Sequence, residues 1–381
     1  MRAKLTAAFA LLALALGACD KDKDVAPPAA IVPFNAKLSV QRLWEENLGG
    51  KDRRLRLELR PAVDGTRVYA AAGDGEIRAF EPKSGRSLWR VKTKLELSAG
   101  PGVGEGLVVL GTSDGQVIAV DAATGARRWQ VRTTGEVLAA PAVAPQAVVV
   151  RTVDGRVHGL ALDNGHELWS NEQPIPRLTL RGTSAPALAG DTVVCGFDNG
   201  KVAAYSIANG DVLWDTGVSP PHGKTELERL VDIDGEIAVS GHDVFVASFQ
   251  GRVAMLALDS GQVWWSRELS SYRGLTLEGE TLFVTGADSS VQALRRRDGT
   301  PIWQQEAMLR RGLTSPEVDG DWVVLADFEG YVHWLDKASG ALLGRTRAAK
   351  GRITNAPVAQ NGIVYVQTDA GQLFAFRARA R

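Results

Sequence analysis

The sequence predicts an all-β fold, an eight-bladed β-propeller of four-stranded blades with quinoprotein-like Trp repeats. Three observations lead to this prediction. A pattern recurs about every 40 residues, a Trp holds one fixed place in most copies, and a lone strand pattern near the N-terminus completes the last copy. The composition agrees, because 41 Gly and 10 Trp beside 3 Met supply the turns and large aromatic side chains of an all-β repeat protein.

Each copy of the repeat has the same two turns. In the first, Asp74-Gly75 leads through an alternating strand to Ser84-Gly85 and then to Trp89. The 14-residue spacing from the first glycine to the Trp recurs in Gly115–Trp129, Gly155–Trp169, Gly200–Trp214 and Gly251–Trp265, and in the degenerate copies Ser289–Trp303 and Gly330–Gly344. An apolar run precedes each first turn, so one copy contains two β-hairpins, the four strands of a propeller blade.

The eighth copy lacks its Trp strand at the C-terminal end of the chain. The apolar run at 362–366 and the strand at 372–376 have none after them, whereas Ser39 to Trp44 has the Trp strand pattern with no hairpin before it. We therefore expect this N-terminal strand to complete the eighth blade and close the ring, which removes the unpaired edge of an open stack. The propeller is expected to occupy residues 36–381.

The recurring side chains are interpreted as structural, not catalytic. Seven Trp occupy one equivalent position per blade, where a rigid apolar ring fills the wedge between neighbouring sheets: 44, 89, 129, 169, 214, 265 and 303. The five His have no metal-ligand spacing, and no phosphate-cradling glycine loop or Gly-x-Ser-x-Gly turn is present. The sequence therefore predicts no catalytic residue, no metal site and no cofactor. Equal numbers of basic and acidic residues, 44 each, argue against a nucleic-acid partner.

The N-terminal 35 residues are set apart from the fold. Arg2 and Lys4 precede an apolar stretch at 5–16, which predicts a signal peptide over residues 1–18. Leu16-Gly17-Ala18-Cys19 is similar to the lipobox of bacterial lipoproteins, in which the cysteine becomes the acylated N-terminus. Residues 19–35 are thus expected to be the lipidated anchor and a flexible tether, because they are rich in charge, Ala and Pro without a strand or helix period.

Spacing between the copies locates a candidate site. From the end of one copy to the next first turn there are 24 to 27 residues at five junctions, but 31 after Trp44, 31 after Trp169 and 37 after Trp214. The last two junctions join adjacent blades by the same kind of connection, so their extra residues should emerge side by side on one face. Variable loops on a rigid scaffold are where binding residues concentrate.

The two long junctions differ in chemistry. The first contains Leu178, Leu180 and Arg181, apolar residues beside a planar cation, and the second contains Asp232 and Asp234. A basic and an acidic loop set together suit a polar protein–protein contact with an Arg anchor and an exposed acidic rim. They equally suit two loops that only cap the ring and pair with one another. The residues alone leave both interpretations open.

Several motifs together resemble the BamB family, lipoproteins of the outer-membrane β-barrel assembly (BAM) machinery. They are the lipobox, the Trp repeats, and the segments 178–186, 225–234 and 329–334. The resemblance covers essentially the whole chain and implies a non-enzymatic scaffold that docks on the periplasmic POTRA domains of BamA. In that role it assists delivery and insertion of β-barrel outer-membrane proteins. Expected partners are BamA, other BAM subunits, unfolded outer-membrane proteins and, through lipid, the membrane.

Residue by residue, the resemblance places Leu178, Leu180 and Arg181 on the family's first BamA-contact loop, and Asp232 and Asp234 on the second. It also implies a lipid-anchored location at the periplasmic face of the outer membrane. Asp20 departs from this pattern, since in enteric bacteria Asp after the anchor cysteine retains a lipoprotein in the inner membrane. The alternative from the enzyme class is a quinone-dependent dehydrogenase, which would need an acidic calcium site that the sequence does not show. A third interpretation is a propeller that binds extended substrate chains by β-augmentation.

Overall fold

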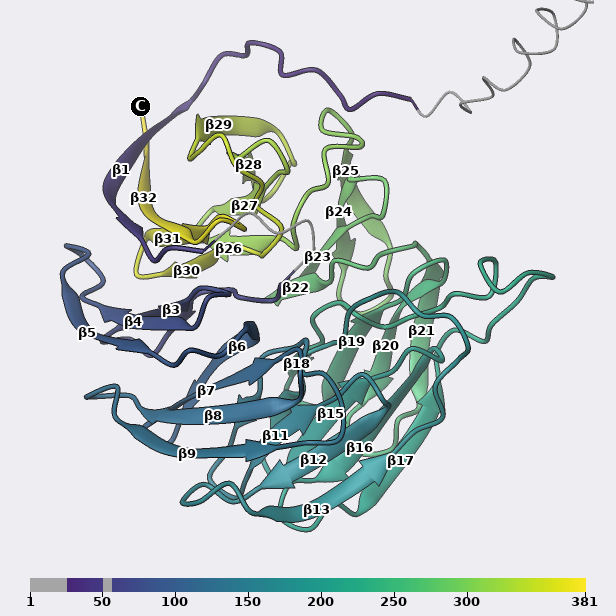
Figure 1. Cartoon of the computed structure of the whole chain (residues 1–381). Helices are drawn as coiled ribbons and strands as arrows, with labels where there is room; N and C mark the ends of the chain where they lie inside the picture. The colour runs from purple at the N-terminus through teal and green to yellow at the C-terminus, as the bar shows by residue number, and fades with distance from the viewer. Residues whose placement is uncertain (1–25, 51–56) are drawn as a thin grey trace, which may run out of the picture.

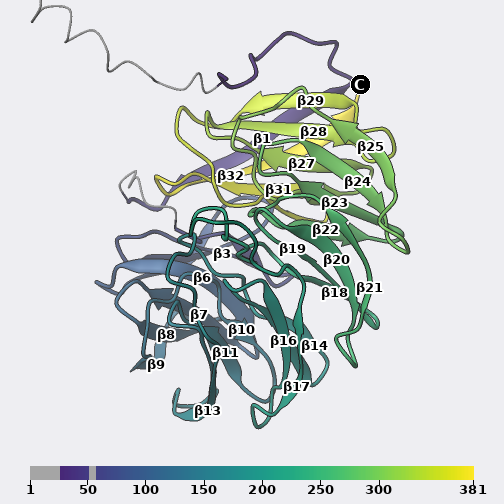
Figure 2. The same ribbon diagram turned by 90° about the vertical axis from the view of Figure 1, so that its right-hand side faces the viewer.

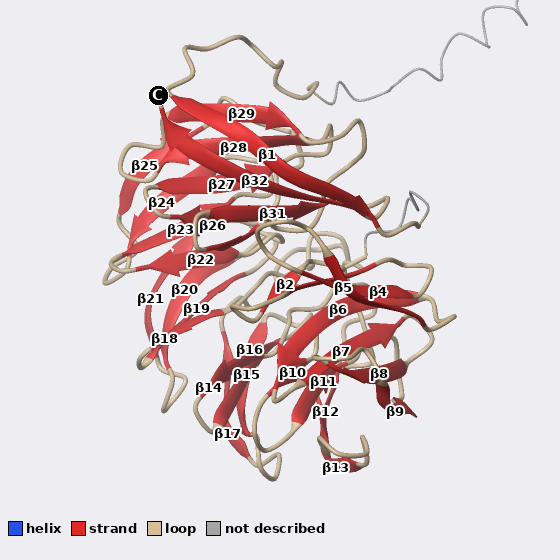
Figure 3. Ribbon diagram, turned by 90° about the vertical axis from the view of Figure 1, so that its left-hand side faces the viewer, coloured by secondary structure: helices blue, strands red, loops and turns tan. Residues whose placement is uncertain are grey.

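The computed structural model describes residues 26–50 and 57–381, and within these ranges all regular secondary structure is β-strand (Figure 1, Figure 3). The strands form eight antiparallel sheets of four strands each, as predicted. No helix in the described part of the chain is long and apolar enough to cross a membrane.

Each sheet is one blade, whose strands follow one another from the innermost to the outermost. Blades 1 to 4 are β2 (Ala62–Val63), β3 (Val68–Ala71), β4 (Glu76–Phe80), β5 (Ser87–Lys92); β6 (Leu97–Gly104), β7 (Leu107–Thr112), β8 (Gln116–Asp121), β9 (Arg127–Arg132); β10 (Ala142–Val143), β11 (Val148–Arg151), β12 (Arg156–Leu160), β13 (Glu167–Glu172); β14 (Ala187–Ala189), β15 (Thr192–Gly196), β16 (Lys201–Ser206), β17 (Val212–Gly217). Blades 5 to 8 are β18 (Ala238–Ser240), β19 (Asp243–Ala247), β20 (Arg252–Ala257), β21 (Val263–Glu268); β22 (Leu275–Glu278), β23 (Thr281–Thr285), β24 (Val291–Arg295), β25 (Pro301–Gln305); β26 (Glu317–Asp319), β27 (Trp322–Ala326), β28 (Tyr331–Asp336), β29 (Leu342–Arg347); β30 (Val358–Gln360), β31 (Ile363–Gln367), β32 (Gln372–Ala380), β1 (Leu38–Asn47).

The blades form a ring through their innermost strands. β2 contacts both β6 of blade 2 and β30 of blade 8, so the first and last blades are neighbours. Figure 2 shows the blades from a second side. Because every blade has four antiparallel strands in order from the inner to the outer one, all connections between blades emerge on one side of the ring, which we call the loop face. The opposite side carries the turns between the third and fourth strands and is called the turn face.

The N-terminal strand closes the ring, as predicted. β1 pairs with β32 in antiparallel register from Leu38 opposite Ala380 to Asn47 opposite Gln372. The eighth sheet therefore combines three C-terminal strands with one N-terminal strand. This arrangement leaves β32 with partners on both sides.

The seven repeated Trp side chains fill the spaces between blades and bind the next blade. Each indole Nε1 donates a hydrogen bond to a main-chain carbonyl in the third-to-fourth-strand turn of the following blade, at 2.7 to 3.0 Å: Trp44 to Pro82, Trp89 to Ala122, Trp129 to Leu162, Trp169 to Ile207, Trp214 to Leu258, Trp265 to Arg296 and Trp303 to Lys337. The same turns contain the repeated second glycine. At Gly165 (φ +74°), a Cβ would lie 2.6 Å from the Trp129 ring, so the indole and the glycine are required together.

Blade 7 is the exception to this pattern. Its outer strand has Gly344 where the other blades have Trp, and a Cβ there would lie 3.1 Å from Leu38 of β1. The space between blades 7 and 8 is filled instead by the fully buried Trp334 of β28, whose ring meets Phe376 edge-on at 6.2 Å. The close approach of β1 to β29 explains why a small residue suffices there.

The N-terminal strap, residues 26–37, runs beside blade 7 before it enters β1 (Figure 1). Its backbone donates hydrogen bonds from Ala29 N to Leu309 O (2.9 Å) and from Lys37 N to Leu343 O (2.8 Å). The expectation of a flexible tether through residue 35 is therefore wrong for this part, because main-chain groups of the segment are paired with the propeller. The predicted signal peptide, Cys19 and the first residues of the tether lie outside the described residues.

Candidate functional site

The two long junctions predicted to carry a site lie on the loop face, on both sides of blade 4. The first loop, residues 173–186, joins β13 to β14, and the second loop, residues 218–237, joins β17 to β18. They meet at a hollow of about 330 Å³ lined by Ile175, Pro176, Arg177 and Leu178 of the first loop and by Pro221, Glu226 and Arg229 of the second. The sequence prediction that they emerge side by side is correct.

The second half of the second loop is a buried support for the first. Residues 230–235 are all buried, although residues 220–229 are all exposed. The Asp232 carboxylate, with no exposed surface, accepts a hydrogen bond from the backbone N–H of Leu180. At Gly182 a Cβ would lie 2.8 Å from Asp234 Oδ2. The two loops therefore approach closely at this point, and the absence of a side chain on the glycine permits it.

This placement corrects the expected exposed acidic rim. Asp232 and Asp234 are 0% and 8% exposed, so neither offers the open carboxylate that a rim contact requires. The apolar neighbours Leu230, Val231 and Ile233 pull this part of the loop into the protein. Those flanking residues were the signal in the sequence that could have predicted the burial.

Asp232 lies in an electrostatically unusual place. Burial raises its pKa to about 7, and the nearby Asp198 carboxylate adds to this, while the Leu180 N–H opposes it. Asp198 itself is paired with the buried Arg151, whose Nη2 lies 2.8 Å from Asp198 Oδ1. The second loop therefore rests on a buried ion pair between blades 3 and 4.

The first loop presents the exposed part of the site. Leu178 is 39% exposed and Ile175 is 51% exposed, while Leu180 is half-buried above Asp232. The Arg181 side chain is 39% exposed and its Nη2 lies 3.1 Å from Glu136 Oε2, on the neighbouring connection between blades 2 and 3. An exposed ion pair of this kind contributes little to stability. Ile175 and Glu136 were not among the site residues predicted from the sequence.

The tip of the second loop is a single exposed turn. Glu228 accepts backbone N–H bonds from Lys224 (2.7 Å) and Thr225 (3.1 Å), and Thr225 Oγ1 accepts one from Glu228 N (3.2 Å). These reciprocal bonds form a capping box, and the backbone N–H groups lower the pKa of Glu228. Leu227, held by this turn, is 66% exposed. Together with Ile175 and Leu178 it gives the site an apolar surface with charged residues around it.

The central channel is crossed at the loop face by an ion-pair cluster. Arg60 Nη1 lies 2.7 Å from Glu236 Oε1, and its Nη2 lies 2.7 Å from Glu317 Oε2 and 3.0 Å from Pro357 O. The cluster thus links blade 1 to blades 5, 7 and 8 across the channel. A cavity of only about 110 Å³ remains beside it. This volume is below the roughly 300 Å³ at which small-molecule sites usually begin.

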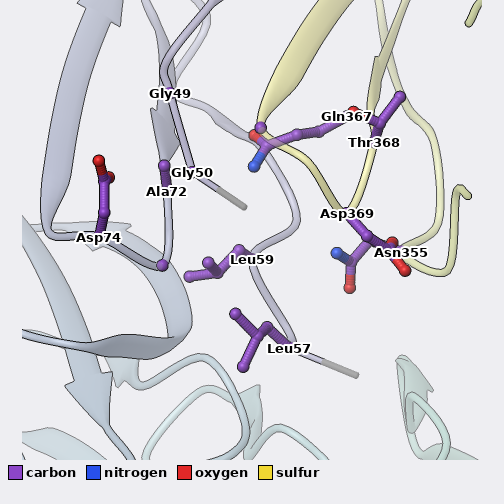
Figure 4. Close-up of a pocket in the computed structure, with 12 residues that line it drawn as sticks. Gly49, Gly50, Leu57, Leu59, Ala72, Asp74, Asn355, Gln367, Thr368 and Asp369 are labelled. Atoms are coloured by element: carbon purple, nitrogen blue, oxygen red, sulfur yellow. The ribbon is translucent and has the colours of Figure 1, made fainter. Parts of the chain in front are cut away.

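A second cavity, of about 350 Å³, lies on the loop face at the seam between blades 8 and 1 (Figure 4). Leu57 and Leu59 form one apolar side, and the polar side chains that line the cavity are Asp74, Asn355, Gln367, Thr368 and Asp369. In the described ranges, no three His, Cys, Asp or Glu side chains are placed to hold a metal ion. The free Cys195 is fully buried, which raises its pKa to about 12.

Sequence comparisons match the chain to one family. The family model described as outer membrane protein assembly factor BamB matches residues 73–305 and 287–380. The protein of that name from Pseudomonas aeruginosa is 39% identical over 373 residues, which cover 97% of this chain and 98% of that one. The one from Marinobacter adhaerens is 44% identical over 372 residues, which cover 97% and 95%.

Comparison with solved structures points to the same family. The crystal structure of BamB from Moraxella catarrhalis superposes with a TM-score of 0.80 at 28% identity, over 89% of this chain and all of that one. A quinohemoprotein alcohol dehydrogenase from Pseudomonas putida has a TM-score of 0.69 at 14% identity over 89% of this chain and 76% of that one, a likeness of fold alone. The length, the identity and the fold agree, and this chain belongs to the BamB family of outer membrane protein assembly factors.

Proposed function

We propose that the protein is a non-enzymatic scaffold of the outer-membrane β-barrel assembly machinery, which docks on the POTRA domains of BamA through its two long loops. The observation that carries this proposal is the paired-loop surface: an apolar patch with an accessible Arg, held in place by a buried carboxylate of the neighbouring loop. Relatives at 39% and 44% identity over nearly the whole chain are named as outer membrane protein assembly factors.

The site residues have two different roles in this proposal. Leu178, Leu180 and Arg181 supply the contact, because a planar guanidinium with apolar side chains around it is the usual composition of a small binding hot spot. Asp232 and Asp234 act from beneath. They hold the first loop in its conformation, so that little order has to be gained on binding.

The location completes the proposal. Residues 1–18 direct export, Cys19 is acylated, and the protein is held at the periplasmic face of the outer membrane, where BamA presents its POTRA domains. Several acyl chains are needed for stable attachment, and a near-neutral propeller adds little electrostatic attraction of its own. Substitution Cys19→Ala should therefore release a folded protein from the membrane.

A quinone-dependent dehydrogenase is not favoured. Arg60, Glu236 and Glu317 meet across the middle of the loop face and leave a cavity of about 110 Å³ there, smaller than an ordinary small-molecule site. The proposed absence of catalysis rests on this small cavity and on the names of the relatives.

The test is affinity capture from solubilised envelopes with the mature protein as bait. We expect BamA and other subunits of the machinery to be recovered from the parent protein and lost with Arg181→Glu. The matched control is Arg86→Glu, an exposed arginine on the turn face of blade 1. Recovery of BamA by neither the parent nor the control would contradict the proposed function.

A further inference from the structure

We propose that Arg310, Arg311 and Arg345 form a clamp that binds the N-terminal strap by its backbone and fixes the point at which the membrane tether leaves the propeller. That point lies on the loop face, at the connection between blades 6 and 7. The membrane part of this inference rests on the proposed acylation of Cys19; the clamp itself does not.

The three arginines of the clamp each bind one of three carbonyl groups spaced along the strap. Arg310 Nε donates to Pro27 O at 2.8 Å, Arg311 Nη1 to Ala29 O at 2.9 Å and Arg345 Nη2 to Val32 O at 2.7 Å. In the reverse direction, Ala29 N donates to Leu309 O. The clamp therefore recognises an extended main chain over six residues.

The side chain of the central arginine, Arg311, is held by acidic residues of blade 7. Arg311 is 2% exposed, and its Nε and Nη2 are bound to Asp327 (2.8 Å) and Glu329 (2.7 Å). Asp327 also lies 3.0 Å from Nε2 of the buried His333. Because these partners fix the guanidinium, its remaining Nη1 is aimed at the strap without further loss of side-chain freedom.

The strap has the sequence that such a clamp needs. Pro27, Pro28 and Pro33 favour an extended backbone and have no N–H groups to leave unpaired. Phe34 adds one side-chain contact, since the Arg345 guanidinium lies 5.1 Å from its ring centre and 5.8 Å from that of Tyr331.

The position of the clamp has a geometric consequence. Arg310 and Arg311 lie on the connection from β25 to β26, and all such connections share the loop face with the two long loops. Only seven residues lie between Cys19 and Pro27, and the eight Cα-to-Cα steps span at most about 28 Å when fully extended. The part of the loop face between blades 6 and 7 is therefore kept near the bilayer, and the docking loops lie on that same face.

Amide hydrogen exchange on the Cys19→Ala protein tests the clamp without the membrane. The variant Arg310→Ala/Arg345→Ala spares the buried Arg311, and Arg86→Ala/Arg297→Ala removes two exposed arginines elsewhere as a matched control. We expect the amides of Ala29 and its strap neighbours to exchange about tenfold faster or more in the clamp variant, since it loses two hydrogen bonds. Equal exchange in parent and clamp variant would overturn the clamp.

The orientation of the propeller on the membrane can be tested by fluorescence energy transfer. A single dye on the protein is the donor and a labelled lipid is the acceptor, and the acylated protein is bound to vesicles of phosphatidylethanolamine and phosphatidylglycerol. Lys350→Cys lies on the loop face and Ala338→Cys on the turn face of blade 7, and the buried Cys195 should stay unlabelled. We expect stronger transfer from position 350 than from position 338, and a smaller difference in the clamp variant. Equal transfer from both positions in the parent would overturn the membrane part. Protein that never binds vesicles would instead refute acylation, and the exchange result would still stand.

Discussion

The contacts between blades and the contacts between the two long loops are both built from a buried polar group and a glycine, but they differ in repetition. Between blades, one indole and one glycine recur around most of the ring, so the same small set of contacts is made seven times. Between the loops, Asp232 and Gly182 make a contact that occurs once. Because the contact repeats, the ring tolerates its loss at Gly344, where Trp334 fills the space instead, whereas the contact between Asp232 and the first loop has no second copy.

The largest effect should come from breaking the ring at its closure. Deleting residues 36–46 removes all of β1 except Asn47, leaves the edge of β32 unpaired and empties the space that Trp44 fills. We expect a loss of several kcal/mol, in the range of large-to-small core changes or above. The control deletes 20–32, which removes only part of the strap and leaves β1 intact. Coincident thermal melts of the two deletions would contradict the closure.

A glycine pair can isolate the contribution of one indole contact. Gly165 and Gly190 both have positive φ, +74° and +62°, but a Cβ meets the Trp129 ring at 2.6 Å in the first and nothing within 4 Å in the second. Gly190→Ala should cost about 1 kcal/mol for backbone strain alone. Gly165→Ala should cost about 2–4 kcal/mol, because overpacking adds to the strain. Equal losses in chemical denaturation would mean that the indole does not require the glycine.

In the loop pair, Asp232→Lys should act through stability as well as binding. An exposed acidic rim would have made this substitution weaker than Arg181→Glu, but the structure buries the side chain. A lysine there loses the Leu180 hydrogen bond and buries an unpaired charge, so we expect a loss of about 2–4 kcal/mol together with loss of BamA binding. Asp232→Asn keeps an acceptor for Leu180 and should retain both. A fully stable Asp232→Lys protein would place this residue at the surface.

The same carboxyl should give a smaller, pH-dependent effect. Its folded pKa of about 7 lies above the unfolded value near 3.9, so the folded state binds the proton more tightly and parent stability falls as pH rises from about 4 to 7. Asp232→Asn lacks this titration. The parent should therefore lose stability relative to the variant in that window, at no more than about 1.4 kcal/mol per pH unit for one proton.

Other groups contribute equally to the pH dependence of parent and variant, so the comparison removes their contributions. Glu317 is one of them, because burial raises its pKa to about 7 as well. A difference between parent and Asp232→Asn that stays constant from pH 4 to 7 would show that Asp232 has an ordinary pKa. Urea unfolding across the pH range gives the required free energies.

The ring was predictable because its contacts repeat. A constant 14-residue spacing revealed seven blades, six of them with a Trp at its end, and the missing Trp strand after 376 identified the closing strand of the eighth. The loops were only partly predictable. Their lengths located the site, but nothing repeats there, and the burial of Asp232 was signalled only by its apolar neighbours Val231 and Ile233. The attachment of the strap was not predictable, because composition does not show that Arg311 binds one of its carbonyl groups.

The central claim is that the exposed surface of the first loop, and not the ring, binds BamA. Its most direct test is a calorimetric titration of purified BamA POTRA domains into the parent, Arg181→Glu and Arg86→Glu proteins, with thermal melts of each. We predict at least about thirtyfold weaker binding for Arg181→Glu, unchanged binding for Arg86→Glu, and melting temperatures within a few degrees of the parent. A well-folded Arg181→Glu protein that binds with unchanged affinity would contradict the claim and leave the two loops as a cap on the ring.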